Sequence, residues 1–311
     1  MNVHFTKMHG AGNDFVVFNA LNGLPDLSPE QYRQIADRRY GIGCDQLLII
    51  APPADTANDF SYRIINSDGS EVEQCGNGAR CFMRFVCDEG LTIKKTVRVE
   101  VATGVIVLQE CDNGLIEVNM GVPRFNPNDL PFNPQGLDCI SHNSTDFLSY
   151  HFNFPADIAN KETINISVGT VSMGNPHAVH TVENIDTAKV AEYGTWLENH
   201  SAFSRRINVG FMQIIDTHTI KLRVWERGAG ETLACGTGAC AAAVVGIQQG
   251  VLKSPVTVQA KGGTLTISWK GKTDDVVRMR GPAVTVFKGI LNLTDLKHAN
   301  FMPNNSNPLL K

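Results

Sequence analysis

The sequence predicts an α+β fold of two homologous domains related by a pseudo-two-fold axis, each a mainly antiparallel sheet wrapped around a central helix. The first observation is a motif, Cys-Gly-x-Gly-Ala, that occurs twice, beginning at Cys75 and at Cys235. The second is that the flanking chain repeats with it, because residues 62–79 align with 222–239. The third is that each half combines short apolar runs with a helical pattern directly after the cysteine. Matches that recur in order along both halves indicate a duplicated chain.

The first half contains short strands and two helices. Apolar runs predict strands at 15–20, 46–51, 60–66 and 97–102. Ser28 to Gln31 form a capping box with Pro29 at the first helical position, so we expect a helix from there to about Gly41. A second helix follows Cys75 and stops at Gly90, and Asn113-Gly114 predicts a hairpin turn.

The second half repeats this plan. Asp186 is expected to start the counterpart of the first helix, and the helix after Cys235 stops at Gly250. That last helix is almost wholly Ala, Val and Ile, which predicts burial on most sides. Upstream the alignment shifts by a few residues: Gly12-Asn13 falls on Gly174-Asn175, and we align residues 43–46 with 210–213.

The domain limits follow from the repeat. We expect an N-terminal domain over 1–121 that also receives the terminal strand, 281–293, and a C-terminal domain over 122–280. The seam falls in a segment rich in Pro and Asn near 121–136. Residues 294–311 are expected to form a disordered tail.

Composition narrows the class of protein. The chain has 311 residues, 42% of them hydrophobic, and a formal net charge of −4. This charge gives no bulk attraction to nucleic acid or to an anionic membrane, which favours a small-molecule partner. The sequence has no signal-peptide profile and no stretch long enough to span a bilayer, so we expect a cytoplasmic protein. Its eight cysteines are then reduced thiols, and none lies at zinc-binding spacing, so no metal site is expected.

The two cysteine motifs suggest a chemistry. A thiol at a helix N-terminus should have a lowered pKa, and the neighbouring N–H groups can hold a carboxylate. If the two motifs face each other across a pseudo-two-fold cleft, one thiolate can remove an α-proton while the other thiol protonates the opposite face. The backbone amides would stabilise the carbanion, and no cofactor would be needed. Which thiol is ionised in the free protein stays open.

The alternative is that these cysteines only pack in the core, as free cysteines often do. Duplication of the motif argues against this, because packing does not demand the same thiol at both helix starts. The packing role is retained for the other six cysteines: Cys44, Cys81, Cys87, Cys111, Cys139 and Cys240. The Gly-x-Gly elements do not continue as a nucleotide-binding loop.

Six segments together resemble the diaminopimelate epimerase family: MHGAGNDF, DRRYGIGCDQLL, NSDGSEVEQCGNGARC, VSMGNPHAV, INVGFMQ and ERGAGETLACGTGACAA. The resemblance covers about residues 1–293. It implies a cofactor-independent interconversion of LL- and meso-2,6-diaminopimelate, in lysine and peptidoglycan precursor biosynthesis. It also implies a homodimer, although Phe287 stands where some relatives have Tyr.

The resemblance assigns residue roles. Cys75 and Cys235 match the acid/base cysteines, and His177 and Glu226 match positions that support activity. The implied substrate-binding residues are Asn13, Gln46, Asn66, Gly76, Asn77, Asn175, Asn208, Glu226, Arg227, Gly236 and Thr237. Two other readings remain: a proline or hydroxyproline racemase of the same fold, and a non-catalytic thiol redox or binding protein.

Overall fold

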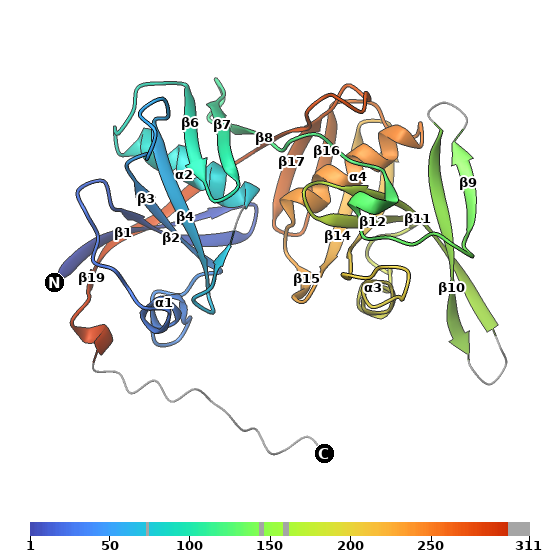
Figure 1. The fold of residues 1–311 in the computed structure, drawn as a ribbon, viewed down its shortest axis with the longest axis horizontal. Helices are drawn as coiled ribbons and strands as arrows, with labels where there is room; N and C mark the ends of the chain where they lie inside the picture. The colour runs from blue at the N-terminus through green and yellow to red at the C-terminus, as the bar shows by residue number, and fades with distance from the viewer. Residues whose placement is uncertain (73–74, 143–145, 158–161, 298–311) are drawn as a thin grey trace, which may run out of the picture.

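The computed structural model describes residues 1–72, 75–142, 146–157 and 162–297. Two lobes lie side by side (Figure 1). The first lobe is built mainly from the first half of the chain. Its elements are β1 (Asn2–Gly10), β2 (Asn13–Asn19), α1 (Pro29–Ala36), β3 (Gln46–Ala51), β4 (Phe60–Asn66), β5 (Glu71–Val72), α2 (Gly76–Asp88), β6 (Thr96–Val101), β7 (Gly104–Glu110) and β8 (Ile116–Asn119).

The second lobe repeats this order after a connecting segment that contains a short 3-10 helix. Its elements are η1 (Pro127–Asp129), β9 (Asp138–His142), β10 (Phe147–Asp157), β11 (Glu162–Ser172), β12 (Pro176–Thr181), α3 (Val190–Glu198), β13 (Asn208–Asp216), β14 (Thr219–Glu226), β15 (Gly230–Thr232), α4 (Gly236–Gln248), β16 (Val256–Ala260), β17 (Gly263–Ser268) and β18 (Arg278–Gly281). The chain then forms β19 (Val284–Asn292) and η2 (Asp295–Lys297).

The two lobes have the same strand pairing, which confirms the predicted α+β fold class. In the first lobe β1–β2, β3–β4, β6–β7 and β7–β8 are antiparallel, whereas β2–β3 and β4–β6 are parallel. The second lobe repeats these six pairings with β11, β12, β13, β14, β16, β17 and β18. β8 pairs with β18 and so joins the two halves, and the described strands form one continuous sheet.

A strand that follows each repeat unit pairs with the first strand of the other unit. β10, which follows the first repeat unit, pairs with β11 of the second. β19, which follows the second unit, pairs antiparallel with β1 of the first, so that Asn2 lies opposite Asn292. On this pairing we propose domain limits of 1–121 with 281–293, and 122–280.

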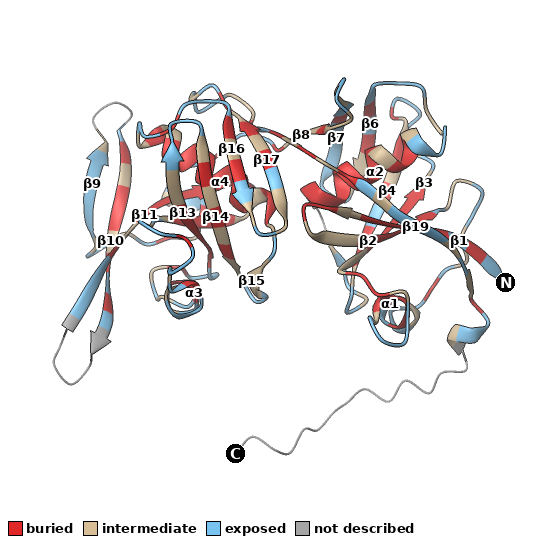
Figure 2. Ribbon diagram, turned by 180° about the vertical axis from the view of Figure 1, so that it is seen from behind, coloured by how far each residue is buried: buried red, intermediate tan, exposed pale blue. Residues whose placement is uncertain are grey.

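The two central helices occupy equivalent places and lie in the interior. α2 and α4 each have 13 residues, and each begins immediately after its motif cysteine. Buried residues follow both helices and the strands around them (Figure 2). One apolar core surrounds α2 and α4 and runs through both lobes, and two smaller cores lie beneath α1 and α3. No helix in the described part of the chain is long and apolar enough to cross a membrane.

Two helix boundaries differ from the sequence prediction. α1 begins with the predicted capping box but ends at Ala36, well before Gly41. The reason is that the Ile35 carbonyl accepts from both Ile42 N and Gly43 N, which turns the chain back. α3 starts at Val190, not at Asp186, because residues 185–187 form a turn closed by Asn184.

The expected tail is only partly described. Asp295–Lys297 form η2, so the prediction of disorder from residue 294 is wrong for these residues. Residues 298–311 lie outside the described part of the chain.

The strand register corrects one part of the repeat alignment. Phe15 pairs with Gln46 between β2 and β3, and His177 pairs with Asn208 between β12 and β13. Asn13 lies two residues before Phe15, and Asn175 lies two residues before His177, so Gln46 is equivalent to Asn208. The alignment of residues 43–46 with 210–213 is therefore wrong. The two segments share a glycine and a glutamine, but β13 is three residues longer than β3, and such a match along a longer strand does not fix the register.

Candidate active site

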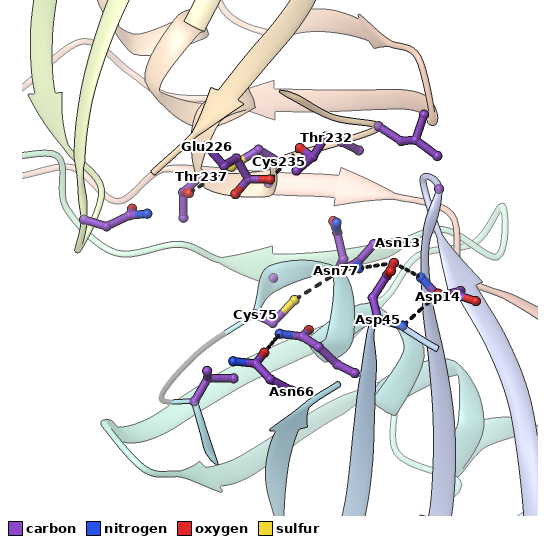
Figure 3. A pocket seen from close by; sticks show the side chains of 18 of the residues that line it. Asn13, Asp14, Asp45, Asn66, Cys75, Asn77, Glu226, Thr232, Cys235 and Thr237 are labelled. Carbon is purple, nitrogen blue, oxygen red and sulfur yellow. Dashed lines mark hydrogen bonds between the residues drawn. The ribbon is translucent and has the colours of Figure 1, made fainter. Parts of the chain in front are cut away.

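A cleft of about 1230 Å³ lies between the lobes, with residues of both halves on its walls. Cys75, Asn66, Asn77 and Asn13 lie on one wall, and Cys235, Glu226, Thr232 and Thr237 lie on the facing wall (Figure 3). Of the predicted site residues, the lining contains Asn13, Gln46, Asn66, Cys75, Gly76, Asn77, Asn175, Glu226, Cys235, Gly236 and Thr237. The structure thus brings most of the predicted set to one place.

The two cysteines occupy equivalent N-cap positions. Cys75 and Cys235 have extended backbones, with φ of −147° and −121°. The Cys75 thiol lies 3.6 Å from Asn13 Oδ1, and Gly78 N donates to Cys75 Sγ at 3.4 Å. Cys235 Sγ lies 3.5 Å from Thr237 Oγ1. Each sulfur therefore sits at the mouth of its helix, with one polar partner supplied from the cleft wall.

Both thiols have raised pKa values, which contradicts the prediction of a lowered one. Burial raises the pKa of Cys75, and the N–H groups of Gly78 and Asn77 and the charge of Arg80 only partly oppose it. Burial and the neighbouring Glu226 carboxylate raise the pKa of Cys235 well above its ordinary value. The physical reason is that loss of water around a buried thiolate outweighs the helix N-terminus.

The motif glycines let the two helix starts approach each other. A Cβ on Gly76 would lie 2.7 Å from Met279 Cε, and a Cβ on Gly236 would lie 3.3 Å from the same atom. The Gly236 Cβ would also lie 3.5 Å from Asn77 Oδ1. Both N-termini therefore meet around the Met279 side chain, and α2 contacts α4. A side chain at Gly76 would force the ends of Met279 or Met120 to move, and one at Gly236 would crowd Met279.

Several side-chain amides of the cleft are fixed by a neighbour. Gln46 Nε2 donates to Asn66 Oδ1 at 3.0 Å. Asn175 Oδ1 accepts from His177 Nε2 at 3.0 Å, which leaves the Asn175 NH₂ as its free donor end. The Nε2–H tautomer leaves Nδ1 of His177 as a buried acceptor with no partner among the described residues. Amides held in this way need little reorganisation to bind a carboxylate.

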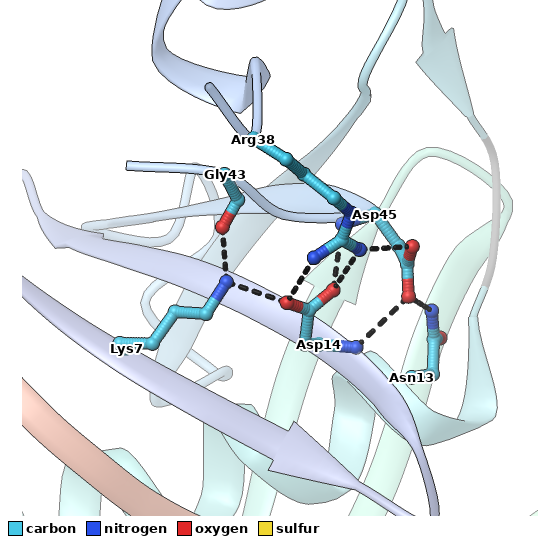
Figure 4. A network of polar contacts seen from close by, with 6 residues as sticks. All are labelled: Lys7, Asn13, Asp14, Arg38, Gly43 and Asp45. Carbon is cyan, nitrogen blue, oxygen red and sulfur yellow. Dashed lines mark hydrogen bonds and ion pairs between the residues drawn. The ribbon is translucent and has the colours of Figure 1, made fainter. Parts of the chain in front are cut away.

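Asn13 is held by a network of charged residues (Figure 4). Asn13 Nδ2 donates to Asp45 Oδ2 at 2.8 Å, so that Oδ1 is left for the Cys75 thiol. Arg38 bridges Asp45 and Asp14, with N–O distances of 2.7 Å to each carboxylate. The buried ammonium of Lys7 lies 2.6 Å from Asp14. Arg38 and Lys7 hold the pKa of Asp14 well below its ordinary value despite partial burial.

The facing wall carries a second carboxylate pair with different partners. Glu226 Oε1 accepts from Thr232 Oγ1 at 2.5 Å, and the same carboxylate lies beside Cys235. Glu231 forms a two-bond pair with Arg223 and is also 2.7 Å from Lys261 Nζ. Two cations therefore balance the charge of the Glu231 carboxylate. The Glu226 carboxylate bonds a hydroxyl group and forms no salt bridge among the described residues, so a cationic group of a ligand can bind it.

Three predicted site residues do not line the cleft. Asn208 is buried, donates to Pro176 O at 2.9 Å and accepts from Arg227 N at 3.0 Å. His177 is buried behind Asn175, where burial and the Arg227 charge lower its pKa to about 3. The Arg227 side chain is exposed and donates to Arg205 O at 3.0 Å.

Sequence reasoning missed several residues of the walls. Asp14, Arg38, Asp45, Glu231 and Thr232 line the cleft, although none was predicted as a site residue. A signal existed for some of them, because Asp14 and Asp45 lie next to the predicted Asn13 and Gln46. For Glu231, the signal was that the repeat places a glutamate, Glu71, at the equivalent position of the first half, and both line the cleft. Among the described residues there is no group of three or more His, Cys, Asp or Glu arranged to hold a metal ion.

Comparison with known proteins agrees with the resemblance found in the sequence. The family described as Diaminopimelate epimerase matches residues 5–126 and 169–286. The diaminopimelate epimerase of Cupriavidus taiwanensis is 50% identical over 296 residues, covering 95% of this chain and 99% of that protein. That of Herminiimonas arsenicoxydans is 53% identical over 293 residues, covering 94% and 100%.

Solved structures show the same fold at low sequence identity. A PhzF-family phenazine biosynthesis protein of Bacillus anthracis has a TM-score of 0.63 at 15% identity, covering 94% of this chain and 99% of that chain. A hydroxyproline epimerase of Agrobacterium vitis, solved with trans-4-hydroxy-L-proline, has a TM-score of 0.62 at 14% identity, covering 93% and 92%. From the family match and the two relatives of half-identical sequence, the chain belongs to the diaminopimelate epimerase family.

Proposed function

We propose that the protein is a cofactor-independent epimerase that interconverts LL-2,6-diaminopimelate and meso-2,6-diaminopimelate, a step in lysine and peptidoglycan precursor biosynthesis. The observation that carries this proposal is that Cys75 and Cys235, equivalent N-cap residues of a duplicated fold, line opposite walls of one cleft. Family membership supplies the substrate, and the cleft supplies a chemistry that suits it.

The reaction needs one base and one acid on opposite faces of the α-carbon. The thiolate of one cysteine takes the α-proton, the C–H bond breaks, and its electron pair delocalises into the substrate carboxylate. The thiol of the other cysteine then gives its proton to the opposite face, and the second sulfur becomes the thiolate. Configuration is inverted, and no oxidant or other reactant is consumed. The reverse reaction exchanges the roles of Cys75 and Cys235.

The helix starts would stabilise the intermediate. The first N–H groups of a helix have no partner inside it. Gly76, Asn77, Gly236 and Thr237 are the first residues of α2 and α4, and they line the same cleft as the two cysteines. Two sets of donors around one carboxylate favour the charge that develops when the α-proton leaves. This is the role we assign to the four residues.

The rest of the substrate carries a carboxylate and an ammonium of fixed configuration. We assign the ammonium to Glu226, and the carboxylate to the amides of Asn66, Asn175 and Asn208 together with Arg227. Asn208 and Arg227 both lie outside the lining, so this assignment requires both side chains to turn toward the cleft on binding. The cleft volume exceeds the ~300–1,000 Å³ of typical small-molecule pockets, which agrees with a site that closes over its ligand.

The decisive assay follows the purified protein in heavy water with LL-diaminopimelate and no added cofactor. We expect early product to carry deuterium at the inverted carbon, while recovered starting material does not. Rapid labelling of the starting material before turnover would contradict two separate single-proton bases. If the protein neither inverts diaminopimelate nor exchanges its α-proton, a non-catalytic thiol protein would explain the structure better. If it inverts hydroxyproline instead, the protein would be a racemase of the same fold.

Cysteine variants provide the matched test. Cys75→Ala or Cys235→Ala should abolish inversion without unfolding the protein. Cys81 and Cys240 lie on the same two helices and are fully buried, so Cys81→Ala and Cys240→Ala serve as controls. They should keep inversion at a rate close to wild type, so equal losses in all four variants would point to a packing effect instead of chemistry.

We further propose that the protein is a cytoplasmic homodimer. The support is a group of exposed apolar side chains on β19: Val284, Val286, Phe287 and Ile290. Phe287 is 49% exposed and packs edge-on against Phe5. An apolar contact needs no tyrosine hydroxyl there. Phe287→Asp should give a monomer by light scattering, whereas an unchanged mass would place the dimer contact elsewhere or exclude it.

A further inference from the structure

Arg80 is a fully buried cation whose partners are all neutral. It lies on α2, five residues after Cys75, with 0% of its surface exposed. Its guanidinium donates to Asn77 Oδ1 at 2.9 Å and to Pro282 O at 3.2 Å. Weaker contacts reach Gly76 O and the Met279 sulfur. Within the described residues it forms no ion pair with a carboxylate, and the titratable groups that act on it are nearby cysteines.

The fold makes room for this side chain. A Cβ on Gly281 would lie 3.0 Å from Arg80 Nε, and a Cβ on Gly10 would lie 3.4 Å from Arg80 Nη2. The equivalent position in the second half is Cys240, which is also 0% exposed. The scaffold therefore accepts a small neutral residue at this place. Because an unpaired buried charge is costly, packing does not explain the arginine.

The contact with Asn77 links Arg80 to the cleft. Arg80 occupies the carbonyl oxygen of the Asn77 amide, so the NH₂ group is the end left for a ligand. Asn77 lines the cleft, and its Oδ1 lies 3.5 Å from the place of a Cβ on Gly236. Arg80 thus stands directly behind the point where the two helix N-termini meet.

The charges around the two sulfurs are unequal. Arg80, a cation, lowers the pKa of Cys75 against the effect of burial, and Glu226 opposes it there. At Cys235 the neighbouring charge is Glu226, which raises the pKa further. The other titratable groups that face Arg80 are Cys81 on the same helix and Cys240 on α4. The two thiols occupy equivalent positions, but a cation lies near Cys75 and has no counterpart among the described residues whose charges act on Cys235.

We propose that Arg80 is a positioning residue of the reacting site, whose fork fixes the Asn77 amide and whose unpaired charge favours negative charge on the Cys75 side of the cleft. This rests on the proposed function of the two cysteines. The missing anion of Arg80 is then supplied by the reaction: the Cys75 thiolate when that thiol gives up its proton, and the substrate carboxylate as it gains charge.

The test separates charge from geometry with three variants of the full chain. Peptide mass spectrometry follows the alkylation of Cys75 and of Cys235 by iodoacetamide across pH, while kcat/KM is measured with LL-diaminopimelate. Arg80→Met should slow Cys75 alkylation about tenfold at a fixed pH below its titration, and Cys235 alkylation by at most about twofold. Cys240→Ala, at the equivalent buried position, should leave both rates near wild type.

Arg80→Lys keeps the charge but loses the planar fork. We expect its Cys75 alkylation to stay within about threefold of wild type, while kcat/KM falls about tenfold because Asn77 loses its partner. An unchanged alkylation profile in Arg80→Met would overturn the charge role, and wild-type kcat/KM in Arg80→Lys would overturn the positioning role. Arg80→Gln replaces Arg80→Met as the neutral variant if the latter does not fold. Alkylation uses no substrate, so it tests Arg80 even if the substrate assignment fails.

Discussion

Glu231 and Glu71 occupy equivalent places in the two halves, yet their surroundings differ. Glu231 bonds Arg223 at 2.7 and 2.8 Å and also meets Lys261. The side chains of this pair are 17% and 21% exposed, against 51% and 43% for Arg63 and Glu71. The hydrogen bonds from Arg223 and Lys261 hold the pKa of Glu231 at about 2, although partial burial opposes them.

This difference gives a size for the effect of Glu231→Gln. A carboxyl pKa that falls from 4.5 to about 2 on folding stabilises the native state by at most ~3 kcal/mol. Because about a fifth of the Glu231 side chain meets water, screening reduces this to about 1–2 kcal/mol at pH 7. The contribution is complete above the ordinary carboxyl pKa and is lost as the pH falls from about 4.5 toward 2.

Urea unfolding of the wild type and of Glu231→Gln at pH 7, 5 and 4 measures the contribution of Glu231 to the free energy of unfolding. We expect a full difference at pH 7 and 5 that begins to shrink at pH 4. Glu71→Gln is the matched control and should cost less than about 1 kcal/mol, since its pair is exposed. Equal losses in the two variants, or a difference that stays constant with pH, would refute the reasoning.

Two further predictions concern the cleft, and a third concerns the buried His177 behind Asn175. Asp45→Asn removes the carboxylate that holds the Asn13 amide and should lower kcat/KM about tenfold in steady-state assays, so wild-type activity would contradict the positioning of Asn13 by Asp45. Thr232→Val leaves Glu226 without its hydroxyl donor and should lower kcat/KM by a similar factor, whereas Thr232→Ser should retain most activity. His177 stays neutral in the native state down to about pH 3, while the unfolded chain takes up a proton below pH 6.5. Stability should therefore fall by about 2 kcal/mol between pH 7 and 5 from this residue, and His177→Gln should remove that fall in urea unfolding.

The duplication was the strongest signal in the sequence. It placed both cysteines at helix starts, and the structure puts both at N-caps on the walls of one cleft. The bounds of the strands at 46–51 and 60–66 were predicted to the residue, because a compact apolar run between polar residues leaves little choice of where the strand begins and ends.

Other features depend on three-dimensional contacts that no local pattern contains. The thiol pKa was predicted in the wrong direction, since the helix N-terminus is local but the burial around Cys235 comes from the whole fold. The equivalence of Gln46 with Asn208 depends on pairing across two strands. Arg80 lay inside a recognised motif, yet its unpaired burial is visible only once Pro282 and Met279 have returned from the far end of the chain.

The reciprocal placement of β10 and β19 bears on how such a chain arose and how it can be divided. A single ancestral unit would have left an open strand edge on its own sheet, and a second copy would have filled that edge with its trailing segment. Fusion of the two copies would then have made this exchange of strands permanent. Fragments cut at the centre of the present chain should accordingly be unstable apart and recover structure only when mixed.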